Sequence, residues 1–285
     1  MTAIVIDGVA IARAERQALR GRIAKLAERG ITPGLAVVIV GEDPASRLYV
    51  RNKVRACEEL GMHSTTHVFP ANASQDTLTS CIRNLNEDPL VHGIIVQLPI
   101  PKGYDLRAVI ETIAVHKDVD GFHLYNVGGL MIGGDMVFPP CTPYGVQILL
   151  ERSGIPVEGQ NVVVVGASNI VGKPMAMMLL QKDATVSICH VKTRDLAQFT
   201  ILADILVVAA GQPNLIRAEM VRRGAVVIDV GINRLPDGRL VGDVDFENVR
   251  KKASYITPVP GGVGPMTVTM LLNNTVSAAE QSLKG

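Results

Sequence analysis

The chain has 285 residues, too many for one ordinary hydrophobic core and suited to two domains of average size. Lys and Arg total 28 against 27 for Asp and Glu, so no strong field favours nucleic acid or an anionic membrane surface, and a small-molecule enzyme fits. The opening segment lacks a secretion signal, and no apolar run approaches the roughly 18 residues of a membrane span, so a cytoplasmic location is expected. The 4 cysteines are scattered, so neither a zinc site nor a disulfide framework is expected.

The first half alternates strand-like and helix-like segments, which is typical of a parallel sheet with helical crossovers. The clearest strand is LAVVIV at 35–40, and two more are expected at 64–69 and 91–98. Segment 43–60 follows the first strand and opens with a capping residue and Pro44, so it should be a helix.

Three polar residues should meet at one edge of this sheet. Tyr49 and Lys53 are four apart, so they share one flank of the helix near its start, beside the carboxyl end of the preceding strand. Gln97 closes the strand HGIIVQLPIP at the same edge, where its amide needs a hydrogen-bond partner. Open α/β sheets bind ligands at this edge. A plain surface tyrosine and lysine is the alternative interpretation.

Two further segments, 117–130 and 256–272, converge on this crevice by topology. The second, rich in Pro and Gly, should be a rigid extended loop that exposes its backbone to a ligand before a helix begins. In the first, Asp118 and Asp120 are candidate ligand contacts, with helix caps or turn formers as the alternative.

The second half opens with NVVVVGASNIVGKPMAMMLL at 161–180, which predicts a buried strand, a tight turn and a helix. Gly166 lets the chain reverse, Ala167 and Ser168 leave room for a close backbone approach, and Gly172 allows tight helix–strand packing. A pyrophosphate could then rest on the helix N-terminus. The spacing G-x-S-x-x-x-G is one residue longer than the common G-x-G-x-x-G, so an ordinary strand-to-helix turn is the alternative.

Strands near residues 162, 185, 205, 225 and 255 continue this pattern as a Rossmann-like succession. Between 232 and 244, Asp237-Gly238 lies between apolar-alternating arms and predicts a β-hairpin. The hairpin could serve a dimer contact or be a surface ornament.

The residues after the second strand of this succession bear on the choice of cofactor. An NAD-binding domain usually places an acid there for the ribose hydroxyls. Here TVSICH runs instead into Lys192 and Arg194, which offer positive charge to a 2′-phosphate. NADP is therefore favoured and NAD is not excluded, with ordinary solvated surface charges as the alternative.

Seven short motifs, taken in chain order, resemble the bifunctional methylenetetrahydrofolate dehydrogenase/methenyltetrahydrofolate cyclohydrolase family. They are Tyr49-x-x-x-Lys53, VQLP at 96–99, DVDGFH at 118–123, PCTP at 140–143, GASNIVGKP at 166–174, VIDVGIN at 227–233 and PVPGGVGPMT at 258–267. The resemblance covers nearly the whole chain. It implies an α/β protein, a homodimer whose two α/β domains surround a cleft, the second a Rossmann-like parallel sheet with an added β-hairpin. Residues 1–121 plus 266–285 would form the folate-binding catalytic domain and 122–265 the NADP-binding domain.

The resemblance also implies the chemistry. The family oxidises 5,10-methylenetetrahydrofolate with NADP, then hydrolyses the methenyl product to 10-formyltetrahydrofolate at the same site without a metal, in the one-carbon metabolism that serves purine biosynthesis. Lys53 would be catalytic, principally in hydrolysis, and neutral part of the time. Gln97 would orient it, Tyr49 would stack along the folate and Asp120 would accept hydrogen bonds from the pterin. The other expected contacts are Pro258, Gly261 and Gly262 for folate, and Gly166, Ala167, Ser168, Lys192 and Ile232 for the cofactor.

The chain departs from the family pattern at two positions that matter for the cofactor. Many members have Arg where Ala167 stands, and Arg or Ser where Val191 stands. If NADP is used, Lys192 or Arg194 must therefore supply the contact to the 2′-phosphate. Two other functions stay open: an NADP-dependent dehydrogenase of a shikimate-like hydroxy acid, and a non-catalytic nucleotide-sensing module. Folate turnover distinguishes the bifunctional folate enzyme from both alternatives.

Overall fold

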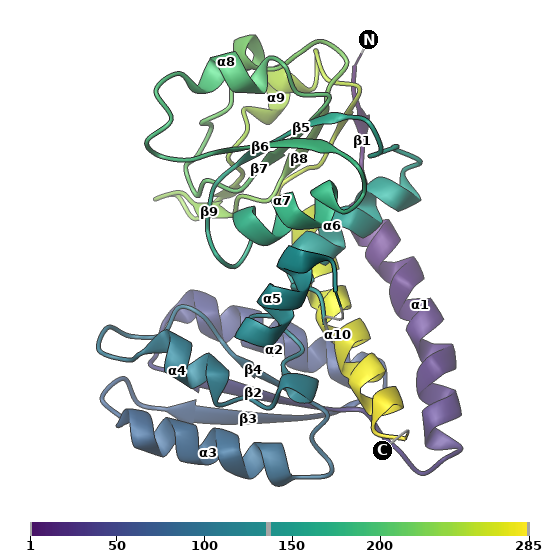
Figure 1. Cartoon of the computed structure of the whole chain (residues 1–285), viewed down its shortest axis with the longest axis vertical. Helices are drawn as coiled ribbons and strands as arrows, with labels where there is room; N and C mark the ends of the chain where they lie inside the picture. The colour runs from purple at the N-terminus through teal and green to yellow at the C-terminus, as the bar shows by residue number, and fades with distance from the viewer. Residues whose placement is uncertain (1, 135–137, 284–285) are drawn as a thin grey trace. The chain divides into compact units, whose positions relative to one another are not determined.

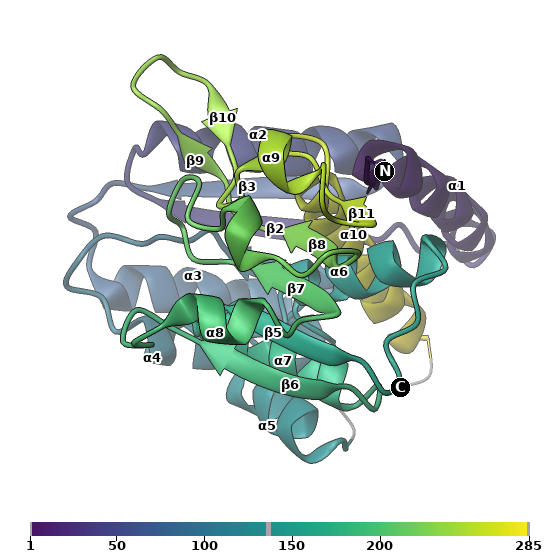
Figure 2. The ribbon, with the colours of Figure 1, turned by 90° about the horizontal axis from the view of Figure 1, so that it is seen from above.

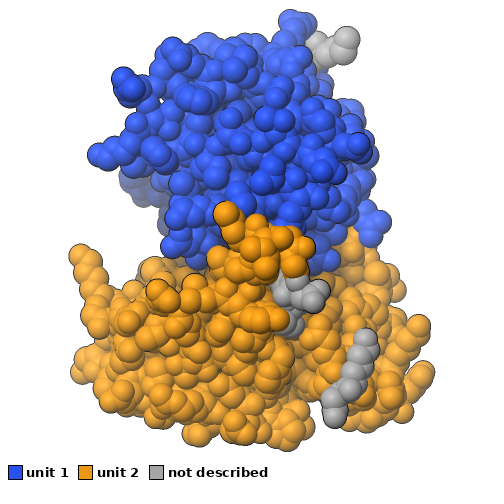
Figure 3. All heavy atoms as spheres, viewed as in Figure 1, with its two compact units in different colours: residues 1–13, 142–267 blue, residues 14–141, 268–285 orange. Residues whose placement is uncertain are grey.

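A computed structural model describes residues 2–134 and 138–283. The chain forms two compact units, shown in Figure 3: unit 1 comprises Met1–Arg13 and Thr142–Thr267, and unit 2 comprises Ala14–Cys141 and Val268–Gly285. Each contains a parallel sheet with helices, so the predicted α/β class is confirmed. Among the described residues, no helix combines the length and apolarity needed to cross a membrane.

Unit 2 is built on a three-stranded parallel sheet in the order β3-β2-β4. Every residue of the central strand β2 is buried, as expected when both faces of a parallel sheet are covered. Figures 1 and 2 both show this sheet between α2 and α3. Its elements are β2 (Gly34–Val40), α2 (Pro44–Glu59), β3 (His63–Phe69), α3 (Gln75–Glu87), β4 (Gly93–Val96), α4 (Leu106–Glu111), a 3₁₀ turn (Val115–Lys117) and α5 (Leu124–Ile132).

Helix α2 begins where the sequence predicts. The Asp43 side chain accepts a hydrogen bond from Ser46 N at 2.8 Å, and Pro44 occupies the first turn, where a missing N–H costs nothing. Val50 and Cys57 are buried, while the arginines at 47, 51 and 55 are exposed. The helix therefore has one apolar face against the sheet.

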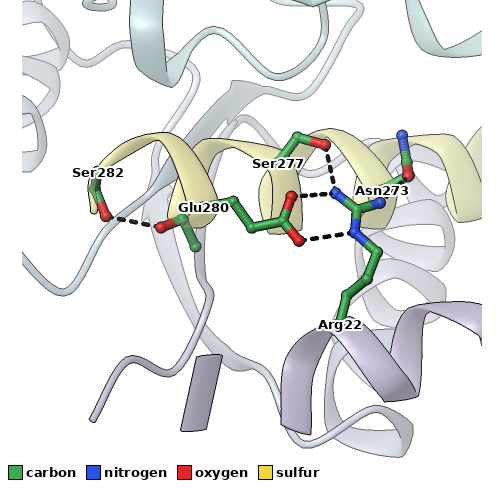
Figure 4. A network of polar contacts seen from close by, with 6 residues as sticks. Arg22, Asn273, Ser277, Glu280 and Ser282 are labelled. Atoms are coloured by element: carbon green, nitrogen blue, oxygen red, sulfur yellow. Dashed lines mark hydrogen bonds and ion pairs between the residues drawn. The ribbon is translucent and has the colours of Figure 1, made fainter. Parts of the chain in front are cut away.

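Unit 2 also contains the later part of α1 (Gly8–Ala27) and most of α10 (Val263–Gln281), which a polar network joins (Figure 4). The Arg22 guanidinium donates to both Glu280 carboxylate oxygens, at 2.9 and 2.6 Å, and to Asn273 Oδ1 at 2.7 Å and Ser277 Oγ at 2.8 Å. Bidentate arginine–carboxylate pairing fixes direction as well as distance. The network thus holds α1 against α10 within this unit.

Unit 1 is built on a six-stranded parallel sheet in the order β1-β11-β8-β7-β5-β6, which confirms the Rossmann-like expectation. Figure 1 shows α8 and α9 on one side of this sheet and α6 and α7 on the other. Its elements are β1 (Ile4–Val5), α6 (Cys141–Arg152), β5 (Asn161–Val165), α7 (Gly172–Leu180), β6 (Thr185–Cys189), α8 (Leu196–Thr200), β7 (Ile205–Val208), a 3₁₀ turn (Ala218–Met220), β8 (Val226–Asp229), β9 (Asn233–Arg234), β10 (Leu240–Val241), α9 (Phe246–Val249) and β11 (Tyr255–Ile256).

The strand order reverses at β5. The chain passes from β5 to β6 on one side and then returns to β7 on the other, so the connections leaving β5 and β7 diverge. Such a switch point leaves a crevice at the carboxyl ends of the strands, where nucleotides bind in this class of sheet. Gly166 follows β5 and Ala209 follows β7.

The predicted hairpin is also confirmed. β9 and β10 pair antiparallel, with Asn233 opposite Val241, and Gly238 in the connecting turn has φ +85°. That backbone conformation suits glycine, as the Asp237-Gly238 signal predicted.

Several boundaries differ from the sequence-based expectations. Residues 1–13 lie in unit 1, because β1 pairs with β11. Unit 2 extends beyond the expected residue 121 to Cys141, because the buried Asn274 amide donates to the carbonyls of Val119 and Pro139. The strand expected at 91–98 is shorter, Gly93–Val96, although backbone hydrogen bonds continue to Gln97. α10 begins at Val263, inside segment 256–272, where a loop was expected to lead into a helix.

Candidate active site

Lys53 and Gln97 meet at the carboxyl edge of the unit 2 sheet. Lys53 lies on α2, which follows β2, and the residue is 9% exposed. Gln97 follows β4, and its backbone N–H donates to Val38 O at 2.8 Å. Lys53 Nζ donates to Gln97 Oε1 at 3.0 Å, while Gln97 Nε2 donates to Leu98 O at 2.7 Å. Both ends of the amide are engaged, so its oxygen is fixed toward the lysine.

Asp118 and Asp120 lie on a segment that continues this sheet, because Asp118 forms an isolated parallel bridge with Ile94 of β4. Asp118 is buried, and its carboxylate accepts hydrogen bonds from His123 N at 2.8 Å and Asn126 Nδ2 at 2.7 Å. Burial raises the pKa of Asp118, while these donors oppose the rise. Asp118 is thus a turn former, and the half-buried Asp120 is the more accessible of the two acids.

Cys141 lies close to both Asp120 and Lys53. Its thiol is buried and donates to Val119 O at 3.2 Å. Burial raises the pKa of this thiol most, the Asp120 carboxylate raises it further, and the Lys53 ammonium lowers it. Both charged groups therefore lie within electrostatic range of one sulfur atom. Sequence reasoning assigned Cys141 no role beyond excluding a zinc site and a disulfide framework, since no local pattern links residue 141 to residues 53 and 120.

Tyr49 lies one turn before Lys53 on α2, and its side chain is 37% exposed. The i, i+4 spacing puts both residues on the same flank, as predicted. The structure thus pairs Lys53 with Gln97, and Tyr49 and Asp120 lie in the same unit. The remaining predicted site residues lie in unit 1.

The turn after β5 has the shape that a phosphate-binding loop requires. Gly166 has φ +125°, and a side chain there would collide with the Ala209 carbonyl. A side chain on Gly172, the first residue of α7, would collide with the Gly166 carbonyl. Ser168 Oγ accepts hydrogen bonds from the amides of Val171, at 3.1 Å, and Gly172, at 3.3 Å. The turn is therefore compact, because its glycines allow the chain to pack closely against its own backbone.

The loop after β6 begins beside this turn, since Gly166 N donates to Cys189 O at 2.9 Å. Its shape is fixed by His190, whose Nδ1 accepts from Lys192 N at 3.2 Å and whose N–H donates to Thr193 Oγ1 at 2.9 Å. Lys192 and Arg194 are both exposed. Two cations thus lie on the loop that meets the adenosine ribose in this fold.

The loop 258–262 follows β11, and Ile232 follows β8, at the same carboxyl edge. Gly262 is buried against the first turn of α1, where a side chain on Gly8 would collide with its carbonyl. Ile232 is 44% exposed, and a β-carbon on Gly264 would lie 3.7 Å from its Cδ1. The predicted residues of unit 1 therefore share one edge of one sheet.

Sequence reasoning missed two buried acids at this edge. Asp229 ends β8, and its carboxylate accepts hydrogen bonds from Gly231 N, Asp243 N and Val244 N at 3.0, 3.0 and 2.9 Å. Burial nevertheless raises the pKa of Asp229 to about 7. The sequence signal that could have revealed these acids is their position next to a strand: Asp229 ends the motif VID at 227–229, and Asp243 ends the motif GD at 242–243. Within the described ranges, no group of three or more His, Cys, Asp or Glu side chains could hold a metal ion.

A Rossmann-like sheet with a glycine turn at its switch point defines a nucleotide-binding protein, and the lysine–amide pair adds a site suited to proton transfer. The family models for the tetrahydrofolate dehydrogenase/cyclohydrolase catalytic domain and NAD(P)-binding domain match residues 6–120 and 140–283. The chain belongs to the tetrahydrofolate dehydrogenase/cyclohydrolase family.

Named relatives agree over nearly the full length. "Bifunctional protein FolD" of Nitrosospira multiformis is 62% identical over 99% of this chain and 98% of its own. The crystal structure of the bifunctional enzyme FolD, methylenetetrahydrofolate dehydrogenase/cyclohydrolase, from Campylobacter jejuni has a TM-score of 0.97 and 51% identity, covering 98% of this chain and 99% of that one. The Trypanosoma brucei enzyme, solved with NADP and an inhibitor, has a TM-score of 0.96 and 42% identity, with full coverage of both chains, 100% each.

The raised pKa of Asp229 predicts how stability changes with pH. Because the pKa of Asp229 rises from 3.8 to about 7 on folding, the folded state binds this proton more tightly than the unfolded state does. The resulting contribution to the free energy of unfolding is complete below about pH 4 and is lost as the pH rises to about 7. Asn at 229 cannot titrate. The free energy of unfolding of the wild type minus that of Asp229→Asn should therefore fall by about 2 kcal/mol between about pH 5 and pH 7.

Urea denaturation of both proteins across this pH range measures the difference. Taking the difference removes the contributions of histidines and other groups that both proteins share. A difference that stays constant, or that rises with pH, would contradict the assignment of a raised pKa to Asp229.

Proposed function

We propose that this protein oxidises 5,10-methylenetetrahydrofolate to the methenyl compound with NADP and then hydrolyses it to 10-formyltetrahydrofolate. The observation that carries the proposal is the hydrogen bond from Lys53 Nζ to Gln97 Oε1 at the carboxyl edge of the unit 2 sheet, in a chain of this family. Relatives that align over nearly the whole chain bear the same bifunctional description.

The hydrolytic step needs a base that becomes an acid. Water adds to the electrophilic methenyl carbon, and the neutral amine of Lys53 takes the proton that this water loses. The resulting ammonium returns this proton to ring nitrogen N5 as the bond between N5 and the carbon breaks. The hydroxyl on that carbon loses its proton to solvent, which leaves the formyl group on N10. Lys53 Nζ donates to the Gln97 amide oxygen, which holds the amine in position for these proton transfers.

Gln97 and Asp120 prepare the site for this chemistry. The Gln97 amide, held by Leu98 O, fixes the direction of the lysine amine. Asp120, which shares the buried Cys141 thiol as a neighbour with Lys53, accepts hydrogen bonds from the amino edge of the pterin. Tyr49 stacks along the folate from the same flank of α2. These roles place the proton carrier and the pterin anchor in one unit.

The residues of unit 1 fit a dinucleotide. The glycine turn Gly166–Gly172 holds the pyrophosphate, and Ala167, Ser168 and Ile232 contact the cofactor. When bound, the oxidised cofactor supplies the hydride acceptor for the first step. Pro258, Gly261 and Gly262 line the folate with backbone groups. In this proposal unit 2 is the folate-binding catalytic domain, expected at residues 1–121 plus 266–285, and unit 1 is the NADP-binding domain, expected at 122–265.

Incubating the protein with 5,10-methylenetetrahydrofolate and either NADP or NAD, while following reduced cofactor and methenyl absorbance separately, tests this function. Both signals are expected with NADP. Lys53→Met should abolish hydrolysis of preformed methenyltetrahydrofolate, with a loss on the order of a hundredfold or more, because no other group takes the proton. Absence of both signals in the wild type would refute the proposal.

Arg51→Met is the matched control for Lys53→Met. It removes one positive charge from the same helix two residues away, but from an exposed position. We expect it to retain hydrolysis within about twofold of the wild type, since surface substitutions change little. Equal losses in the two variants would attribute the effect to charge and not to proton transfer.

Cofactor choice should depend on the loop after β6. We propose that Lys192 pairs with the 2′-phosphate of NADP, since Ala167 and Val191 offer no charge. Lys192→Ala should raise KM for NADP about tenfold and leave KM for NAD within about twofold, because NAD lacks that phosphate. An equal change for both cofactors would assign Lys192 a structural role.

We also propose a cytoplasmic homodimer that supplies 10-formyltetrahydrofolate to purine biosynthesis, as the family resemblance implies. Supporting dimerisation, β6 is an edge strand of its sheet, with Ile188 39%, Phe199 42% and Leu202 64% exposed on or beside it. A second copy pairing antiparallel along β6 would cover this apolar edge. Light scattering should give twice the 30.4 kDa of one chain, and Leu202→Glu should lower the mass. A wild-type mass of one chain would contradict the dimer.

A further inference from the structure

Asp243 follows β10 and is completely buried at the carboxyl edge of the unit 1 sheet, with 0% exposure. Its Oδ2 accepts hydrogen bonds from the backbone amides of Ala210, at 2.6 Å, and Gly211, at 2.9 Å. Its Oδ1 accepts from Asn233 Nδ2 at 2.8 Å. One carboxylate therefore joins the segment after β7 to the segment after β8.

The surroundings of Asp243 leave no room for a different arrangement. A side chain on Gly231 would collide with the Asp243 carboxylate, and one on Gly242 would collide with the Asp229 carboxylate. Asp229 in turn accepts from the backbone N–H of Asp243 at 3.0 Å. The two acids and two glycines form a closed packing unit, so the Asp243 carboxylate has one available position.

The segments that Asp243 holds are those that border the nucleotide crevice. Ala209 precedes Ala210, and its carbonyl packs against Gly166 so closely that no side chain fits on that glycine. Ile232 precedes Asn233 and is an expected contact of the cofactor. A shift of either segment would change the width of the crevice at the strand switch point. Asp243 thus controls two of its borders without facing the crevice itself.

We propose that Asp243 is a positioning residue for the dinucleotide. It holds the backbone of residues 209–211 and, through Asn233, the neighbouring Ile232 in the positions that the dinucleotide requires. The inference rests on the proposed cofactor site. Because preorganised contacts lower the cost of binding, loss of the Asp243 bridge should weaken cofactor affinity and leave hydrolysis at Lys53 unchanged. A purely structural role would instead reduce the amount of folded protein and both activities together.

Asp243→Asn is the principal test. The new amide oxygen can still accept from Ala210 and Gly211, but its NH₂ group faces the Asn233 NH₂ group, so the bridge to the segment after β8 breaks. A flip of the Asn233 amide is opposed because its Nδ2 also donates to Val241 O, at 3.5 Å. Fluorescence titration with NADPH should show a Kd raised about tenfold, and KM for NADP should rise in step. Hydrolysis of preformed methenyltetrahydrofolate without cofactor should stay within about twofold.

Asp204→Asn is the matched control. Asp204 lies at the opposite, amino end of β7, where it accepts from Asn161 N at 3.0 Å and pairs with Arg222. Its substitution should lower the melting temperature but leave the Kd for NADPH within about twofold. Asn233→Ala breaks the same bridge from its other end and should reproduce the raised Kd, which keeps the test decisive if Asp243→Asn fails to fold.

A Kd for NADPH within about twofold of the wild type in folded Asp243→Asn, or in Asn233→Ala if the first variant does not fold, would overturn the proposal. So would an equal rise in Kd in Asp204→Asn, since that would reflect general destabilisation. The binding measurement needs no folate. Failure of the wild type to turn over folate would therefore refute the proposed function while leaving this comparison valid.

Discussion

Parallel pairing is the constraint on which this structure depends. When all strands of a sheet run the same way, the segments that follow them emerge at one edge, however far apart they are in the sequence. In unit 2 this brings Lys53, after β2, to Gln97, after β4. In unit 1 it brings Gly166, after β5, against Ala209, after β7. Each candidate site is a consequence of strand direction.

Buried acids then fix these edges. Asp118 holds the turn that presents Asp120, and Asp229 with Asp243 holds the segments after β7 and β8. A buried carboxylate is costly unless several donors satisfy it, and each of these accepts at least two hydrogen bonds. The hydrogen bonds offset this cost, and they also order several backbone amides that lie outside helices and strands. The acids that shape the sites are thus distinct from those expected to touch ligands.

The sequence predicted what local periodicity and strand direction determine. Apolar runs located the strands, Asp43 and Pro44 marked the start of α2, and Asp237-Gly238 marked the hairpin. The Lys53–Gln97 pairing followed from their shared edge. Cys141, Asn274 and Asp243 were not predicted, because their partners lie far along the chain and no spacing rule relates them. The N-terminal strand was missed for the same reason, since its partner is β11. The specific functional expectation came from the ordered motifs that resemble one family, and no single motif carried it.

The central claim is that the amine of Lys53, oriented by Gln97, accepts the proton from the water that opens the methenyl ring. The most direct test is kcat of Gln97→Leu for preformed methenyltetrahydrofolate, corrected for the spontaneous reaction, because this substitution removes the amide oxygen to which Lys53 Nζ donates. The account predicts that kcat falls about tenfold or more, since the amine is no longer held in position. A corrected kcat within about twofold of the wild type would contradict it.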